Sequence, residues 1–134
     1  MAALSEIRSA LAGSLSSIQG LRTSAHVPDQ PNPPIAVVVP EQIEYDASTF
    51  GSHRYTFRLM LIVGRVDERN AQARLDGYLA TDGAASVKSA VEADRTLGGL
   101  VQVVRVLSAD SYRTVPVGDV TYLTAEMVVE VISQ

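Results

Sequence analysis

Two histidines and one acidic pair are the residues of this sequence best suited to acid–base chemistry. His26 and His53 are its only histidines, and they lie 27 positions apart, in neither an HExxH metal pair nor a nucleophile–histidine triad pattern. Asp67 and Glu68 precede apolar residues at helical spacing. There an Asp typically caps the first turn of a helix and a Glu complements the helix dipole. We therefore expect ordinary loop or strand-end histidines and a helix cap rather than a catalytic acid and base.

Phosphate and metal sites have no stronger support in the sequence. Gly98 and Gly99 precede a strand-like stretch and lack the lysine of a phosphate-binding loop, so we interpret them as a helix stop. Glu41, Glu44 and Asp46 are spread along an extended stretch, where we expect a solvated face. With no cysteine, thiol catalysis, disulfides and thiolate zinc sites are excluded. We expect no enzyme, no cofactor and no metal centre.

Composition predicts one globular domain spanning residues 1–134. The chain is 46% apolar, which is enough for a sizeable core. Its 11 basic and 15 acidic residues give a net charge of -4 without a basic run, so tight nucleic-acid binding is not expected. The N-terminus lacks a basic start, and no segment approaches the ~18 apolar residues of a membrane span. We expect a soluble protein with no signal peptide and no membrane contact.

The first third of the chain predicts a helix, a proline-rich loop and a strand. The helix has an apolar stripe at spacings of three and four: Leu4, Ile7, Leu11, Leu15 and Ile18. Gly20 would stop it, and residues 21–27 would form a short strand or an extended arm. Residues 26–40, HVPDQPNPPIAVVVP, hold five of the six prolines. We interpret them as a rigid loop that enters a short edge strand at Val37–Val39. A domain linker is disfavoured because the ~25 residues upstream cannot bury a core alone.

The rest of the chain predicts strands, two helices and two further strands. Residues 55–63 alternate as a strand whose second face also becomes apolar at Met60 and Ile62. The first helix follows Asp67 with a stripe of Ala71, Leu75, Tyr78 and Leu79. A short helix capped by Ser86 carries Val87, Ala90 and Val91. Later strands are expected at 100–107 and 122–132, with an extended piece at 111–117 and a turn at 117–119. The order predicts an α+β fold, a mostly antiparallel sheet with helices packed on one face.

Three segments, in this order and spacing, carry a family resemblance over nearly the whole chain. They are HVPDQPNPPIAVVVP, YTFRLMLIVGRVDERNAQARLDGY and SVKSAVEADRTLGGLVQVVRV. Their most specific parts are the turn at residues 32–34, the strand end at 63–65 and the turn at 94–99. The chain resembles tail terminator proteins of long-tailed (siphovirus-type) actinobacterial phages.

The resemblance implies a tail-terminator-like fold and a structural function. Such a protein forms a homo-oligomeric, hexameric ring at the head-proximal end of the tail tube, stops tube growth and joins tail to neck. Its implied partners are further copies of itself, the major tail tube protein and a neck or head-completion protein. Genomic DNA would pass through the lumen without specific binding, which suits an acidic chain. The implied location is the virion, at the tail–neck junction, after assembly in the bacterial host cytoplasm.

A ring needs one patch to meet a different patch on its neighbour. Candidate patches are apolar residues at nominally outward strand positions, because large exposed apolar patches are uncommon on monomers. These residues are Met60, Ile62, Val128 and Ile132. A stiff loop used in ring or tail contacts is a second candidate, and its prolines are Pro28, Pro31, Pro33 and Pro34. The alternative is that this loop merely enters the strand.

Two other functions stay open on the sequence. A head-completion or neck adaptor protein would belong to the same structural class, and binding to capsids instead of tail tubes would distinguish it. A small-ligand-binding or enzyme-accessory domain belongs to a different class, and the absence of ring symmetry in negative-stain images would favour it.

Overall fold

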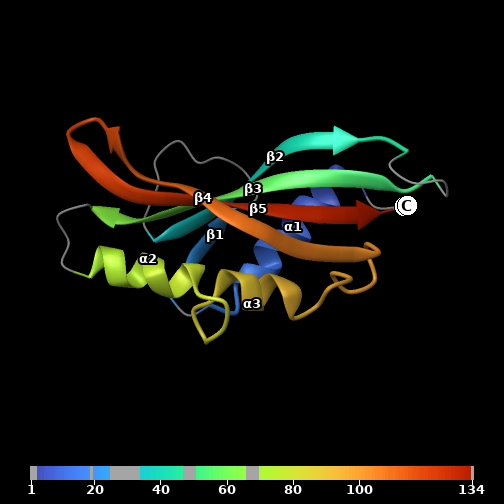
Figure 1. Cartoon of the computed structure of the whole chain (residues 1–134), viewed down its shortest axis with the longest axis horizontal. Helices are drawn as coiled ribbons and strands as arrows, with labels where there is room; N and C mark the ends of the chain where they lie inside the picture. Colours follow the sequence, from blue (N-terminus) through green and yellow to red (C-terminus); the bar gives the residue numbers. More distant parts are fainter. Residues whose placement is uncertain (1–2, 19, 25–33, 47–50, 66–69, 134) are drawn as a thin grey trace.

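The computed structural model describes residues 3–18, 20–24, 34–46, 51–65 and 70–133. These residues form one sheet and the helices packed against it (Figure 1). In chain order the elements are α1 (Leu4–Leu15), β1 (Arg22–Ser24), β2 (Ile35–Glu44), β3 (His53–Arg65), α2 (Ala71–Leu79), α3 (Val87–Glu92), β4 (Val103–Val117) and β5 (Val120–Ser133). The α+β class predicted from the sequence is confirmed.

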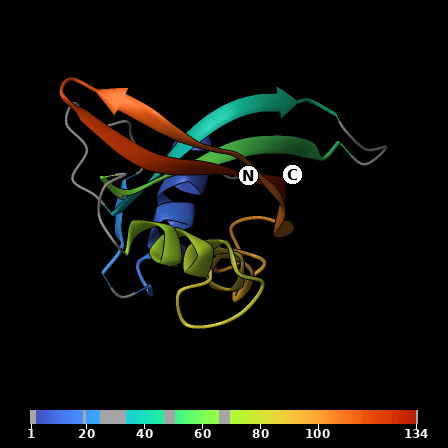
Figure 2. The ribbon, with the colours of Figure 1, turned by 60° about the vertical axis from the view of Figure 1, so that its left-hand side comes forward.

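The sheet has five strands in the order β1-β2-β3-β5-β4. It is mixed: β1 pairs with β2 in parallel, whereas the β2–β3, β3–β5 and β5–β4 pairings are antiparallel. β5 therefore lies in the interior of the sheet although it is last in the chain. The helices lie together on one side of the sheet, and the other side is left open (Figure 2).

The prediction of a short edge strand at Val37–Val39 is wrong in length and in place. β2 runs over ten residues, and β1 pairs with its first three, from Ile35 to Val37. Pro40 is accommodated inside β2 because the register with β3 is irregular between Pro40 and Gln42. Within β2, the described residues from Val38 onward have no strand on the side away from β3.

β4 also differs from the prediction, which placed two separate extended pieces at 100–107 and 111–117. The structure has one strand of 15 residues beginning at Val103. Its register with β5 shifts at two places, and Ser111, within the second shift between Asp110 and Arg113, has a φ of 54°. Such a left-handed residue allows the strand to bend and continue. Residues 94–102 form turns before it, which include Gly98 and Gly99.

The core lies between the helices and the facing side of the sheet. The predicted helix stripe is confirmed, because Ile7, Leu11 and Leu15 are fully buried on α1. The helix ends at Leu15, earlier than the predicted stop at Gly20, and Ile18 is buried in the turn that follows. The predicted alternation of the two long strands is also confirmed, since Leu59, Leu61, Met127 and Val129 are buried. No helix of the described residues is long and apolar enough to cross a membrane.

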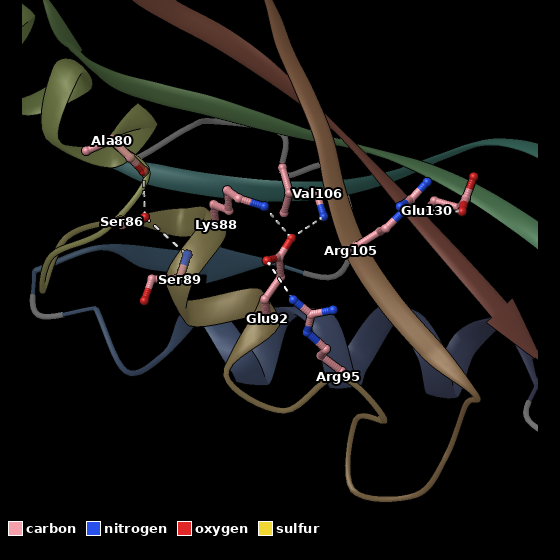
Figure 3. Close-up of polar contacts among 9 residues, drawn as sticks. All are labelled: Ala80, Ser86, Lys88, Ser89, Glu92, Arg95, Arg105, Val106 and Glu130. Atoms are coloured by element: carbon pink, nitrogen blue, oxygen red, sulfur yellow. Dashed lines mark hydrogen bonds and ion pairs between the residues drawn. The ribbon is translucent and has the colours of Figure 1, made fainter.

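The predicted cap of the short helix α3 is confirmed at Ser86. Its hydroxyl accepts a hydrogen bond from the amide of Ser89 at 3.1 Å and donates one to the carbonyl of Ala80 at 2.6 Å (Figure 3). One buried side chain thus satisfies an orphan amide and ties the helix to the chain that precedes it. The predicted cap at Asp67 lies outside the described residues, as does Glu68.

Candidate assembly surface on the open face of the sheet

The open face carries all four apolar strand residues that were predicted for assembly. Met60, Ile62, Val128 and Ile132 belong to the even-numbered positions of β3 and β5, opposite the buried odd-numbered side chains, and each is half-buried. None lies beneath a helix. They do not make one continuous patch, because Val128 is paired with Arg58 and Ile132 with Arg54, whereas Met60 and Ile62 are consecutive on their face.

Met60 and Ile62 form the accessible apolar part of the open face. Their partners on β2, Val37 and Ile35, are only 2% and 6% exposed and so present almost no surface to a partner. Met60 and Ile62 also line a small hollow of about 50 Å³ together with Val115, Tyr122 and Thr124. We define the apolar patch as Met60 and Ile62.

Arg58 is the centre of the charged part of this face. Its Nε donates to Glu41 Oε1 at 2.8 Å and its Nη1 donates to Asp110 Oδ1 at 2.8 Å. Glu126 lies 3.7 Å from the same Nη1. The hydrogen bonds to Glu41 and Asp110 raise the pKa of Arg58 above its already high value, against a smaller effect of burial. A permanently charged arginine thus joins residues from β2, β5 and β4.

Arg54 repeats this arrangement nearer the end of the sheet. Its Nη1 donates to Glu44 Oε2 at 2.9 Å, and its Nε lies 3.4 Å from Glu130 Oε2. Arg105 on β4 lies 3.6 Å from the other oxygen of Glu130. These ion pairs tie neighbouring strands together on the open face, since each carboxylate is already matched by an arginine.

The proline loop is only partly described. Pro34 is half-buried directly before β2, and its carbonyl accepts a hydrogen bond from the amide of Arg22 at 3.0 Å. Pro34 therefore helps to join β1 to β2. Pro28, Pro31 and Pro33 lie outside the described residues, and the proposed contact role of the loop stays a prediction.

His53 is the strand-end residue that the sequence predicts. It begins β3, its Nδ1 accepts a hydrogen bond from the amide of Asp46 at 3.1 Å, and its ring meets that of Tyr45 edge-on at 5.7 Å. Glu41, Glu44 and Asp46 are exposed as expected, but two of them bind arginines of β3. His26 lies outside the described residues.

Glu92 organises a polar cluster between α3 and β4 that sequence reasoning missed (Figure 3). Its Oε2 accepts hydrogen bonds from Lys88 Nζ at 2.7 Å and from the amide of Val106 at 2.9 Å, and its Oε1 lies 3.6 Å from Arg95. Burial alone would raise the pKa of Glu92. The bonds from Lys88 and Val106 and the nearby cations outweigh burial and lower that pKa. The carboxylate is thus an ionised clamp rather than a general base.

Two hollows lie on the helix side of the molecule. One of about 400 Å³ borders the Glu92 cluster and is lined by Lys88, Glu92, Arg95, Arg105, Val106 and Leu107. The other, of about 450 Å³, lies against α2 and includes Arg74 and Tyr78, whose pKa is raised by burial. Over the described ranges, no group of three or more His, Asp or Glu side chains could hold a metal ion.

The comparisons with known proteins add no relative. The sequence matches no family model, and no curated protein is significantly similar to it.

Proposed function

We propose that the chain is a structural virion protein that caps the head-proximal end of a phage tail tube as a ring. In this function it stops tube growth and joins the tail to the neck. The observation that carries the proposal is the open sheet face, where the apolar patch lies beside the ion pairs of Arg58 with Glu41 and Asp110. The order of the three sequence segments that resemble tail terminators supports the same function.

The chemistry of the open face suits a contact between proteins. Protein interfaces combine an apolar centre with a polar, partly solvated rim. Here Met60 and Ile62 supply the apolar centre, and Arg58, Glu126 and Arg113 border it. The arginines are held by carboxylates in fixed directions, which gives a contact its orientation. A small-ligand site would instead need a deep pocket with convergent polar groups.

The proposed partners are further copies of the chain, the major tail tube protein and a neck or head-completion protein. The proposed ring is hexameric, with genomic DNA passing through its lumen. The fold fits this proposal, because a tail-terminator-like domain is small, and antiparallel pairing joins β2, β3, β5 and β4 here. The proposed location is the tail–neck junction of the virion.

The test is capping of purified tail tubes, scored by negative-stain images of rings and of tube length. We expect the wild-type protein to form rings and to bind one tube end. Met60→Glu and Ile62→Glu place charge in the apolar patch and should abolish capping while the chain stays folded. Thr56→Glu is the matched control, because Thr56 is a half-buried residue of the same face and strand outside the patch.

Three results would argue against the terminator function. Normal capping by both patch variants would remove the open face from assembly. Binding of the wild-type protein to capsids but not to tubes would favour a neck adaptor. A wild-type protein that forms no ring and binds neither structure would favour the ligand-binding or enzyme-accessory alternative.

A further inference from the structure

The sign of the charges on the open face alternates from strand to strand. The series is acidic on β2 (Glu41, Glu44), basic on β3 (Arg54, Arg58), acidic on β5 (Glu126, Glu130) and basic on β4 (Arg105, Arg113). Asp110 is the exception on β4, and it hydrogen-bonds to Arg58 of β3. The two lateral sides of the sheet therefore end in opposite charge.

Unused bonding capacity is concentrated at those two sides. Glu126 and Glu130, in the interior, are 16% and 15% exposed, and each lies near two arginines. Arg105 on the β4 side is 57% exposed, and its ion pair with Glu130 is 3.6 Å long. Glu41 and Glu44 on the β2 side are 40% and 49% exposed. A guanidinium has five N–H donors and a carboxylate about four acceptor sites, so both sides can bind more.

The large apolar side chains that the described chain exposes also lie at these two sides. They are Tyr45, directly after β2, and Leu107 and Tyr112, both on β4. Leu107 lines the hollow of about 400 Å³, whose lining holds Lys88, Arg95 and Arg105 but a single carboxylate, Glu92. Figure 3 shows Lys88 and Arg95 turned toward Glu92, whereas Arg105 on β4 turns toward Glu130. In a chain of net charge -4 this hollow is locally basic.

The charged residues of the β2 side and of the β4 side lie at the same height along the strands. Gln42, Thr56, Glu130 and Arg105 lie in one row across β2, β3, β5 and β4. Arg105 is therefore level with the stretch of β2 that carries Glu41 and Glu44. β4 also runs antiparallel to β2 within one sheet, so a second copy with the same face up would present its β2 antiparallel to β4.

We propose that the β4 side of one copy binds the β2 side of the next copy. Glu41, Glu44 and Tyr45 of the second copy dock at the basic hollow of the first, beside Arg95 and Arg105. The contact continues the alternation of charge across the boundary between copies. It is heterologous, as a ring requires. It rests on the proposed ring function and specifies which two surfaces meet.

Side chains rather than backbone pairing carry this contact near the hollow. The amide of Val104 already donates to the carbonyl of Arg95 at 2.7 Å, and the amide of Val106 donates to Glu92. On the β2 side, Pro40 has no amide hydrogen to offer. Charge and exposed apolar side chains remain as the means of recognition.

A charge swap between the two sides tests the contact. The β4-side variant carries Arg95→Glu and Arg105→Glu, and the β2-side variant carries Glu41→Arg and Glu44→Arg. Each variant alone places like charges at the boundary. The protein concentration at which half of the chains are assembled should therefore be at least about tenfold higher than for the wild type. An equimolar mixture should assemble again, because each altered side then meets an oppositely charged one. Sedimentation velocity at low and high salt measures the assembly.

The control for the β4-side variant has the same change in net charge elsewhere. Arg65→Glu with Arg74→Glu alters two exposed arginines on β3 and α2, and it should assemble like the wild type. If a reversal unfolds the chain by circular dichroism, the neutral pairs Arg95→Gln with Arg105→Gln and Glu41→Gln with Glu44→Gln replace it. These pairs should weaken assembly and reduce its dependence on salt.

The outcomes separate this contact from the proposed function. A wild-type protein that stays monomeric at every concentration, or a mixture of folded variants that does not reassemble, would overturn the contact. Tail capping by both reversal variants at wild-type levels would overturn the contact and leave the terminator function standing. Rings that obey the charge swap but never cap a tail tube would support the contact and overturn that function.

Discussion

Leu61→Ala is the most direct test of which face of β3 points toward the helices. Leu61 is fully buried on the helix side of β3, and its cross-strand partners are Ala36 on β2 and Ala125 on β5. The substitution removes three carbons, which at about 0.8 kcal/mol for each buried CH₂ gives about 2.4 kcal/mol. Since both flanking residues are alanines, they cannot extend into the space that Leu61 leaves. A residual cavity should add on the order of 1 kcal/mol.

We therefore expect Leu61→Ala to lower the free energy of unfolding by about 3–4 kcal/mol, inside the ~2–5 kcal/mol range for such deletions. The assay is urea denaturation followed by circular dichroism, with the slope compared between variants to verify two-state unfolding. Met60→Ala is the control, because Met60 is the preceding residue and faces the open side. Its loss should be about 1 kcal/mol.

The refuting result is specific. A loss below about 0.5 kcal/mol for Leu61→Ala would place this side chain outside the core. A larger loss for Met60→Ala than for Leu61→Ala would invert the two faces of the sheet. Either result would also remove the basis for the open assembly surface, since that surface consists of the strand residues that alternate with Leu61 and face away from the helices.

Three further predictions address the cap, the clamp and the loop. Ser86→Ala should lower the free energy of unfolding in urea by about 0.5–2 kcal/mol, whereas Ser89→Ala, which keeps the bonded amide, should have little effect. Glu92→Gln should cost stability above the ordinary carboxyl pKa of 4.5, and the difference from wild type should shrink as the pH falls below 4.5 toward the lowered pKa of the folded state, as urea titrations at pH 7 and pH 3 would measure. A difference as large at pH 3 as at pH 7 would contradict an ionised clamp. A last variant changes three prolines of the loop before β2 to glycine: Pro31, Pro33 and Pro34. It should leave the fold nearly intact yet weaken tail capping, and normal capping would reduce the loop to a connector.

Local patterns were sufficient to predict much of the fold. The stripe of α1 appears as apolar spacing in the sequence because a helix on a sheet must bury one face. The cap at Ser86 was also predictable, since the bonded amide is three residues away. The buried phase of β3 followed from alternation alone.

Pairing between distant segments was not predictable in the same way. β1 is three residues long, and its parallel pairing with β2 has no local signal. The place of β2 inside the sheet follows from that pairing, so the edge-strand prediction failed there. β4 was divided at Ser108–Asp110 because its polar residues are typical of a turn, whereas the strand continues through two register shifts.

The candidate surface was likewise predictable from local patterns in part, and in part depends on pairing between distant segments. Met60, Ile62, Val128 and Ile132 were identified from alternation, without knowledge of which strands are neighbours. That Ile35 and Val37 of β2 flank Ile62 and Met60 was not predictable, because it depends on the β2–β3 register. The ion pairs of Arg58 reach Asp110, 52 positions away, and Glu126, still further along the chain, and only the three-dimensional structure brings them together.

The position of β5 has a consequence for how the protein is made. β5 is paired on both sides, with β3 and with β4, and its last residue Ser133 is opposite His53. A nascent chain that has reached Val117 still has an unpaired side on β3 and no strand partner for β4. The sheet can close only when residues 120–133 have left the ribosome, so we expect β3 and β4 to stay incompletely paired until β5 has emerged. Until then the apolar sides of β3 and β4 are open to other chains, and a chaperone that covers them would raise the yield of folded protein.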